Sequence, residues 1–409
     1  MGVYWMEKGC KKILGLSIQI NKKDNPEIYL KPCIVIMKIG ILTFHRAYNY
    51  GAFLQTFATL AFLRSQGYDV SIVDYMPEGH TDFYRFFNSY WKNSSWIGKT
   101  KYVIRKLIDY PFILNRRKKF HEMQENFFGI ERSVRYITPK DLENVNYDYI
   151  IYGSDQIWWK CKFLTYKGFD LVYWGEYIPK AVKKIAYAPS MGSIDLNETD
   201  ISQIKYWLTN FMAVSVREKQ LSDTLFSISG NYFPVVLDPV FFLDKSQWMK
   251  RCDEVPIRHE KPYLLLYNLQ NSLDARRVAI SLAQRNKWKV VEIKQSFCFD
   301  FSHYYDYTSG PIEFVSLFRD AKFIVTTSFH GTAFSVIFRK PFIVVGLKFA
   351  VDRVLSLLSM LNLDDRYISS MGEDFDLRID YSKVDPLLEA AKERSKNYII
   401  NSLNNTQSQ

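Results

Sequence analysis

Short, continuous apolar runs alternate along most of the chain with segments whose apolar residues recur every three or four positions. The first two runs, residues 38–44 and 69–75, have the length and composition of buried strands. Between them, a glycine-containing turn at 45–51 leads into a helical pattern that ends near Gly67. Strand, helix and strand of these lengths predict a βαβ unit, in which the sheet is parallel and the crossover right-handed.

The same alternation continues through the first domain and then predicts a second α/β set. Residues 148–158, 183–192 and 212–220 each read as a strand with a polar or glycine-containing end. Asp238-Pro239 then interrupts regular structure. Beyond it, the pattern predicts strands at 262–269, 289–294, 323–327 and 341–346, with helices at about 272–286, 351–361 and 383–400.

At 409 residues the chain exceeds what one core usually organises, so two domains are expected. We place the N-terminal α/β domain at 37–240 and the C-terminal one at 241–375. Residues 376–409 are expected to form a helix and tail that pack back on the N-terminal domain. Residues 1–36 read as a loosely attached extension or an over-long gene start, with a short signal anchor as the alternative.

Residues 80–130 interrupt the α/β rhythm of the first domain. An aromatic cluster is followed there by a basic stretch with helical character. Such an insert is able to lie against anionic lipid or a lipid-linked substrate. The alternative is a solvated basic face over a small aromatic core.

Composition and charge narrow the class of protein. The chain is 47% hydrophobic and 24% charged, which is typical of a folded protein, and its formal net charge is +11. No nucleic-acid-binding motif accompanies that charge, so we expect an anionic substrate and peripheral contact with the inner face of a membrane, and no nucleic acid. The five cysteines are scattered and form no C-x-x-C pair, which favours a reducing cytoplasm: Cys10, Cys33, Cys161, Cys252 and Cys298.

Residues 323–338 are the strongest candidate for a reactive corner. A buried strand ends there in Ser328, Phe329, His330 and Gly331, and an apolar helix begins at once. A strand–helix junction presents free backbone N–H groups and the positive end of a helix dipole, so it is able to bind an anion. A lone histidine is often structural, but its place at this junction makes His330 a candidate for chemistry.

Other strand ends carry residues suited to a cleft. Asn49 and Gly51 follow the first strand, together with His45, and Arg217 and Glu218 end a later one. In parallel sheets ligands gather at the carboxyl ends of the strands. No metal site is suggested, and the sequence lacks Walker A, G-x-S-x-G, H-E-x-x-H and G-x-G-x-x-G motifs.

Taken in order, these segments resemble the polysaccharide pyruvyl transferase family. The resemblance runs from Met37 to about Arg366, through KIGILTFHRAYNYGAFLQ, YDYIIYGSDQIW, YAPSMG, SVREK, LDPV and TTSFHGTAFSVIFRKPF. It implies two Rossmann-like domains similar to the GT-B glycosyltransferases. It also implies that phosphoenolpyruvate is the donor co-substrate, with no further cofactor, and that a sugar diol of a glycan or lipid-linked oligosaccharide is the acceptor. The product would be a cyclic pyruvate ketal.

By motif, the resemblance places the phosphoenolpyruvate-binding arginine and histidine at Arg217 and His330. Ser328 stands where several members carry an arginine, so the donor site has one cation fewer or recruits Lys348 or Arg353. The helix opening at Gly331 and Thr332 suits the phosphate.

His330 is the candidate to hold or protonate the leaving phosphate, or to act as general acid. Glu218 and Asp155 are candidate bases beside the acceptor. The acceptor side is expected to consist of His45, Asn49, Gly51, Ser154, Asp155, Gln156 and Trp158.

Two other functions compete with this interpretation. A nucleotide-sugar glycosyltransferase would share the architecture, but would need paired acidic residues in the second domain, and Glu292 and Glu313 are not spaced in that way. A non-catalytic glycan-binding or membrane-surface module would explain the aromatic residues and the charge, but not the ordered strand-end motifs.

Overall fold

The computed structural model describes residues 12–13, 16–20, 28–32, 37–76, 95–161, 167–260, 262–297, 303–346, 351–370 and 376–404. Most of the predicted N-terminal extension, all of 80–94 and Lys348 therefore lie outside the described residues. Within the extension, β1 (Lys12–Ile13), β2 (Leu16–Ile20) and β3 (Ile28–Pro32) pair in antiparallel order.

The first domain is built on a five-stranded parallel sheet in the order β10-β9-β8-β4-β5. Its strands are β4 (Lys38–Leu42), β5 (Asp69–Ile72), β8 (Tyr149–Tyr152), β9 (Lys183–Ala186) and β10 (Ala213–Val214). The strand order reverses between β4 and β8, and ligands of such sheets bind beyond the carboxyl ends at that reversal. The loops that leave these two strands therefore face the expected cleft.

Helices and short helical turns surround this sheet. They are α1 (Tyr50–Ser65), η1 (Pro139–Asn144), η2 (Leu171–Trp174), α5 (Glu198–Trp207), η3 (Leu208–Asn210) and α6 (Lys219–Ser229). Asn49 caps α1 by accepting a hydrogen bond from the Ala52 backbone N–H. A small parallel pair, β6 (Asp74–Tyr75) and β7 (Arg135–Tyr136), flanks the domain.

The second domain contains a six-stranded parallel sheet in the order β13-β12-β11-β14-β15-β16. The order reverses between β11 and β14, as in the dinucleotide-binding arrangement. The strands are β11 (Tyr263–Tyr267), β12 (Lys289–Ile293), β13 (Tyr304–Asp306), β14 (Phe323–Thr326), β15 (Phe342–Val345) and β16 (Tyr367–Ile368). Together the two parallel sheets confirm the prediction of two Rossmann-like α/β domains.

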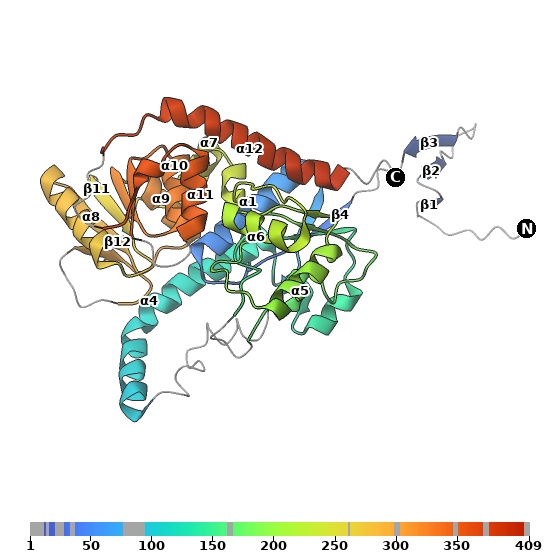
Figure 1. Cartoon of the computed structure of the whole chain (residues 1–409), viewed down its shortest axis with the longest axis horizontal. Helices are drawn as coiled ribbons and strands as arrows, with labels where there is room; N and C mark the ends of the chain where they lie inside the picture. Colours follow the sequence, from blue (N-terminus) through green and yellow to red (C-terminus); the bar gives the residue numbers. More distant parts are fainter. Residues whose placement is uncertain are drawn as a thin grey trace, which may run out of the picture.

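The helices of this part of the chain are η4 (Pro239–Phe242), α7 (Lys245–Cys252), α8 (Leu273–Asn286), α9 (Pro311–Asp320), α10 (Phe329–Ile337), α11 (Val351–Met360) and η5 (Asp364–Arg366). The final helix, α12 (Tyr381–Asn404), runs along both domains (Figure 1). Arg339 pairs with Asp385 at its beginning, and Ser395 accepts a hydrogen bond from the Leu237 backbone farther along. The helix therefore contacts residues on both sides of the inter-domain passage.

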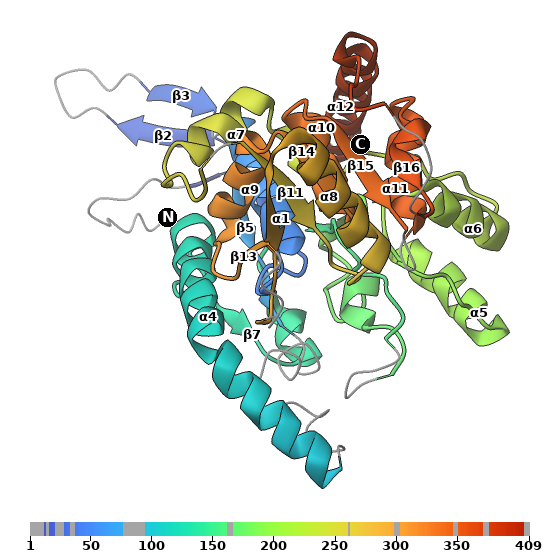
Figure 2. The same cartoon turned by 90° about the vertical axis from the view of Figure 1, so that its left-hand side faces the viewer.

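The basic part of the insert forms one long helix, α4 (Trp96–Phe128). Its first half extends away from both domains, and its second half lies beside them (Figures 1 and 2). Lys119 of α4 pairs with Glu313 of α9, and Phe120 packs against Tyr50 and Phe53 of α1. The second half of α4 thus joins the N-terminal domain to the C-terminal one.

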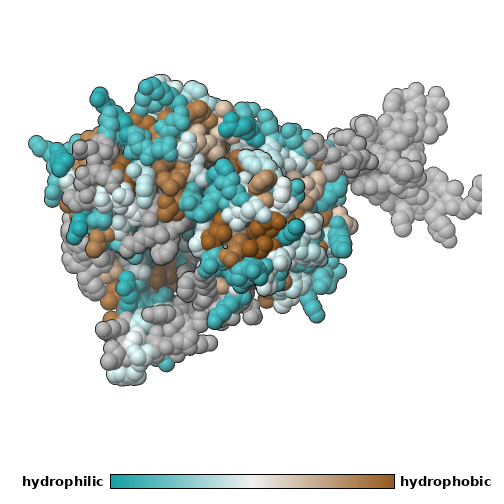
Figure 3. Space-filling model, in the orientation of Figure 1, coloured by the Kyte–Doolittle hydropathy of each residue, from teal (hydrophilic) through white to brown (hydrophobic). Residues whose placement is uncertain are grey.

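The domains also meet through apolar packing. The Tyr50 ring stacks on Phe314 with 4.3 Å between centroids, and its hydroxyl donates to the Ser309 carbonyl. One core cluster includes residues of both sheets. The surface in the same orientation mixes hydrophilic and hydrophobic residues, with a hydrophobic patch near the middle of the view (Figure 3). No helix in the described ranges is both long and apolar enough to cross a bilayer.

Candidate active site

The carboxyl end of β14 positions His330. Ser328 is the N-cap of α10, and His330 lies in the first helical turn. The chain turns tightly here because Gly331 has no side chain: a Cβ at this position would lie 2.1 Å from Thr326 Oγ1. The glycine therefore lets the helix start close against β14, which presents His330 toward the first domain.

Asp238 is the acidic centre of the site. Its Oδ1 caps η4 by accepting from the Val240 N–H, and its Oδ2 accepts from Arg217 Nη1 at 2.8 Å and from Ser154 Oγ at 3.2 Å. The same oxygen lies 3.7 Å from His330 Nε2. One buried carboxylate thus connects the ends of β8, β10 and β14.

Arg217 is buried between the domains. Its guanidinium lies over the Phe329 ring at 4.9 Å, and its Nη2 is 3.7 Å from Asp155 Oδ1. Burial alone would lower the pKa of Arg217, but the carboxylates of Asp238 and Asp155 raise it on balance. The side chain is therefore a fixed cation.

Glu218 and Arg353 extend the cluster on the other side of Arg217. Glu218 is buried, and its Oε1 accepts weakly from the Met191 N–H at 3.3 Å. Arg353 belongs to α11, which is held against the start of α6 by a hydrogen bond from the Lys219 N–H to Ser356 Oγ. Burial raises the pKa of Glu218, whereas burial and the nearby Arg217 charge lower the pKa of Arg353 to about 10.

Several buried polar atoms of this cluster have no hydrogen-bond partner among the described residues. They are Arg217 Nε and Nη2, Glu218 Oε2, His330 Nε2 and Arg353 Nε. A buried donor or acceptor without a partner is costly and calls for an explanation such as a ligand. Most of these atoms are donors, so the group that would satisfy them is an anion.

Residues of the acceptor side are brought to the same place by the first domain. Gly51, in the first turn of α1, lies against the imidazole of His330, because a Cβ at Gly51 would be 2.1 Å from Nδ1. Ser154 is fixed by Gln55 Oε1, which accepts from its backbone N–H at 3.0 Å. Asp155 faces Arg217, and the side chain of Gln156 lies against Gly192. Asn49 is exposed at the start of α1.

Two residues expected on the acceptor side do not face a cleft. Trp158 is completely buried: its ring stacks on Trp174 at 4.3 Å, and its indole N–H donates to the Tyr173 carbonyl. His45 is also completely buried, with Nε2 2.8 Å from Asp74 Oδ1. Their buried partners satisfy both side chains and leave neither an exposed face for a sugar.

The residues predicted on the donor side differ in whether they belong to the cluster or support α10. The Thr332 hydroxyl donates to the Ser328 carbonyl inside α10, and Thr332 is buried, so this side chain supports the helix. Ser328 is also buried, with its backbone N–H donating to Thr326 Oγ1. Arg353, one of the two cations expected to replace the missing arginine, is part of the cluster.

Asp238 was not recognised from the sequence as a site residue. Its Asp-Pro pair was interpreted only as an inter-domain passage. The same Asp-Pro pair carried a signal for a site residue. Asp before Pro is a typical helix N-cap, and an Asp that caps with one oxygen keeps the other for a second partner.

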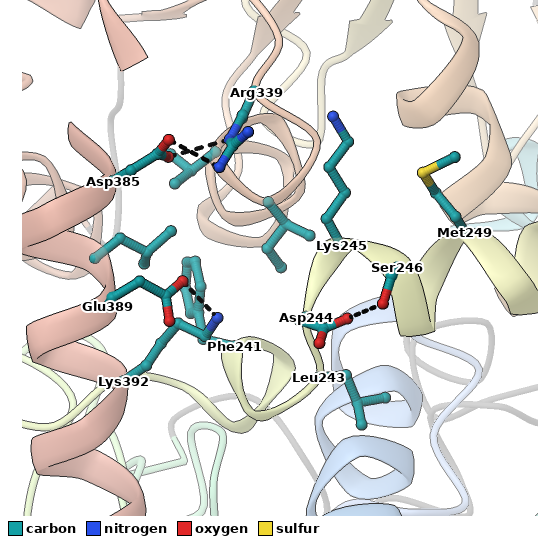
Figure 4. Close-up of a pocket in the computed structure, with 13 residues that line it drawn as sticks. Phe241, Leu243, Asp244, Lys245, Ser246, Met249, Arg339, Asp385, Glu389 and Lys392 are labelled. Atoms are coloured by element: carbon teal, nitrogen blue, oxygen red, sulfur yellow. Dashed lines mark hydrogen bonds and ion pairs between the residues drawn. The ribbon is translucent and has the colours of Figure 1, made fainter. Parts of the chain in front are cut away.

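A separate pocket of about 360 Å³ lies at the other end of α10, between η4, α7 and α12 (Figure 4). Its charged groups are largely paired with one another. Arg339 binds Asp385, Lys392 binds Glu389, and Asp244 accepts from Ser246 (Figure 4). None of the unpartnered buried atoms of the His330 cluster lines this pocket, so the His330 cluster is the better candidate for chemistry.

Comparison with known proteins identifies a family. The model of the family described as polysaccharide pyruvyl transferase matches residues 49–348. No curated protein matches the chain significantly.

Among solved structures, UDP-N-acetylglucosamine 2-epimerase from Rickettsia bellii is 9% identical, with 90% of this chain and 96% of that chain covered and a TM-score of 0.48. The UDP-GlcNAc 2-epimerase from Methanocaldococcus jannaschii in complex with UDP-GlcNAc and UDP is 11% identical, with 90% and 99% covered and a TM-score of 0.46. The E. coli heptosyltransferase WaaC with ADP is 12% identical, with 76% and 87% covered and a TM-score of 0.36. At these TM-scores, the likenesses assign no activity to this chain.

Proposed function

Because the chain belongs to the polysaccharide pyruvyl transferase family, a family of transferases, we propose that it transfers pyruvate from phosphoenolpyruvate to a sugar diol. The acceptor is a surface polysaccharide or its lipid-linked precursor, as in capsule or exopolysaccharide assembly. The products are a cyclic pyruvate ketal and phosphate. The observation that carries the proposal is the set of unpartnered donors around Arg217, His330 and Arg353.

These unpartnered N–H groups match phosphoenolpyruvate, the donor substrate, in number and charge. Phosphoenolpyruvate carries a carboxylate and a phosphate, and an arginine fork suits either group because it donates two parallel hydrogen bonds. Arg217 keeps Nε and Nη2 for this purpose while Nη1 binds Asp238. Position 328, where several family members carry an arginine, is a serine here. Arg353 supplies a second guanidinium in place of that arginine. The two arginines therefore take the two anionic groups.

The reaction needs a proton at the methylene carbon and an electrophilic centre next to it. Burial raises the pKa of Glu218, so this carboxyl is suited to hold a proton and donate it to the methylene group. One acceptor hydroxyl then attacks the adjacent carbon, phosphate leaves with its bridging oxygen, and the second hydroxyl closes the ketal. The proton from Glu218 becomes part of the new methyl group. Of the two hydroxyl protons, one returns to Glu218 and the other leaves with phosphate.

His330 is assigned to the leaving phosphate. Burial lowers the pKa of His330, against the opposing effect of Asp238, and so favours the neutral ring before the donor binds. A bound phosphate adds negative charge beside Nε2 and favours the protonated ring, which then stabilises the departing group. Asp155, across from Arg217, is the candidate base for the acceptor hydroxyl.

The nucleotide-sugar alternative receives less support from the second domain. Glu292 is completely buried and pairs with Arg276, Lys294 and His303. Glu313 pairs with Lys119 and Arg258. Neither carboxylate is therefore available to hold ribose or sugar hydroxyls.

Phosphate release tests the proposal. Purified protein is mixed with phosphoenolpyruvate and candidate glycans, and release should require both. His330→Ala and Arg217→Lys should abolish it, while His121→Ala, a change at an exposed histidine of α4, should not. Release of a nucleoside diphosphate from a nucleotide sugar, or no release with any acceptor, would overturn the proposal.

A further inference from the structure

We propose that the projecting half of α4 docks on the surface of an anionic lipid bilayer. The inference rests on the proposed function for its purpose, which is to hold the cleft at a membrane that carries the lipid-linked acceptor. It deepens that function by naming the face that makes the contact. The exposure, spacing and charge of the residues of α4 support it.

An apolar stripe runs along the exposed side of α4. Trp96 is 81% exposed, Leu107 63% and Leu114 46%, and Tyr110 is also exposed. The steps between these four residues are eleven, three and four positions, and each step returns to nearly the same side of a helix with 3.6 residues per turn. They therefore form one continuous stripe rather than scattered exposed residues.

Where the two halves of α4 meet, the opposite side of the helix is occupied. Phe112 stacks on Phe297, Asp109 Oδ1 accepts from the Phe297 N–H, and Arg116 donates to the carbonyls of Gln295 and Tyr307. Asp109 follows Leu107 by two positions, which is more than half a turn of helix. The contacts with the C-terminal domain thus fix the orientation of α4 and turn the stripe outward.

The charge around the stripe selects an anionic partner. Between Trp96 and Lys119 the helix holds eight Lys and Arg residues and one acidic residue, Asp109. Lys99 and Lys106 flank the stripe seven residues apart. An apolar stripe of Trp, Leu and Tyr flanked by long cationic side chains is the pattern of a helix that lies in the bilayer interface. The net charge of +11 adds a general attraction to anionic lipid.

The second half of the same helix leads to the cleft. Arg117 lies over the Tyr48 ring at 4.9 Å, and Gln124 donates to the His45 carbonyl. These contacts hold the loop between β4 and α1, and the first turn of α1 carries Gly51, which lies against His330. The helix that carries the stripe is therefore also in direct contact with the loop that precedes α1.

Vesicle co-sedimentation tests the docking face without any substrate. The full chain should bind vesicles of phosphatidylcholine mixed with phosphatidylglycerol, and bind pure phosphatidylcholine far less. The double variant Leu107→Glu and Leu114→Glu should lower partitioning about ten-fold, because two charges enter the apolar stripe. Leu273→Glu is the matched control, since Leu273 on α8 is 62% exposed and lies outside the insert. It should bind like the wild type.

A second readout reports on the stripe itself. Trp96 fluorescence should shift to shorter wavelength and be quenched by brominated lipid, and Trp96→Phe should remove that change. Absence of vesicle binding by the wild type, or equal binding by the wild type and the double leucine variant, would overturn the proposal. A change in oligomeric state of that variant without lipid would overturn it too, because the stripe would then join two copies of the chain.

Failure of the proposed function can be distinguished from failure of the docking face. If the function holds, the double leucine variant should retain transfer to a water-soluble acceptor and lose transfer to an acceptor embedded in vesicles. If the wild type transfers to neither acceptor, the proposed function fails, and the vesicle-binding result still decides the docking face by itself.

Discussion

Gly51 of α1 lies directly against the imidazole of His330 of α10: a Cβ at position 51 would be 2.1 Å from the ring Nδ1. The two residues are 279 positions apart in the chain and belong to different domains. Their contact shows that α1 of the first domain and α10 of the second meet at the candidate site. The position must be glycine for the ring to keep its place beside Asp238.

Gly51→Ala should therefore reduce turnover by about 10²-fold, because displacing a reacting group by about 1 Å typically costs that much. The added methyl group pushes the imidazole away from its position. Initial rates of phosphate release measure the effect. Gly129→Ala is the control: this glycine has φ +64° and open space, so the change should cost roughly 1–2 kcal/mol in stability and leave turnover intact. Equal turnover of Gly51→Ala and wild type would show that the contact is not needed.

Asp238→Asn should lower the free energy of unfolding by about 3 kcal/mol, because it leaves the buried Arg217 guanidinium without its closest counter-charge. Denaturant titration followed by circular dichroism measures this loss. Asp223→Asn serves as the reference, since that carboxylate is exposed and pairs with Lys219 at the surface. The free energy of unfolding of Asp223→Asn should fall by less than about 1 kcal/mol. Similar losses for both variants would contradict the central place given to Asp238.

The stability of the protein should depend on pH through Glu218. Burial raises its pKa in the folded state, so the folded protein binds the proton more tightly than the unfolded chain. The stability from this group is present below the unfolded pKa and is lost as pH rises through the folded pKa. Glu218→Gln cannot lose a proton, so it should become more stable relative to wild type as pH rises over this interval. Unfolding titrations across pH check the sign, and a difference independent of pH would contradict it.

Arg353→Ala should raise the KM for phosphoenolpyruvate about ten-fold or more, because a charge-assisted hydrogen bond to the donor is lost. Arg353→Lys should recover only part of this effect, since lysine lacks the planar fork. Arg378→Ala, at an exposed arginine, is the control. An unchanged KM in Arg353→Ala would mean that the site works with a single guanidinium.

Much of the architecture follows from local patterns. The apolar runs that became β4, β8, β11 and β14 were recognisable because strands buried on both faces read as short, nearly continuous apolar runs. The family was recognised from the order of the strand-end motifs, and the comparison confirms it. Arg217, Glu218 and His330 could be named because each follows a predicted strand, and the structure brings all three together.

The burial of individual side chains could not be predicted from local patterns. Trp158 and Gln156 both follow β8, but only tertiary packing decides that the indole turns inward onto Trp174. His45 follows β4 as a catalytic residue would, and its partner Asp74 is 29 positions away. The role of Asp238 depends on contacts with Ser154, Arg217 and His330, which lie on separate elements, so no local pattern contains it.

We propose that this site moves pyruvate from phosphoenolpyruvate onto a sugar. Nuclear magnetic resonance of a glycan acceptor after incubation with ¹³C-labelled phosphoenolpyruvate tests it most directly. The account predicts a labelled ketal carbon and methyl group on the glycan with the wild type and with His121→Ala, and none with His330→Ala. Label that stays in phosphoenolpyruvate or appears only as free pyruvate, with every glycan offered, would contradict it.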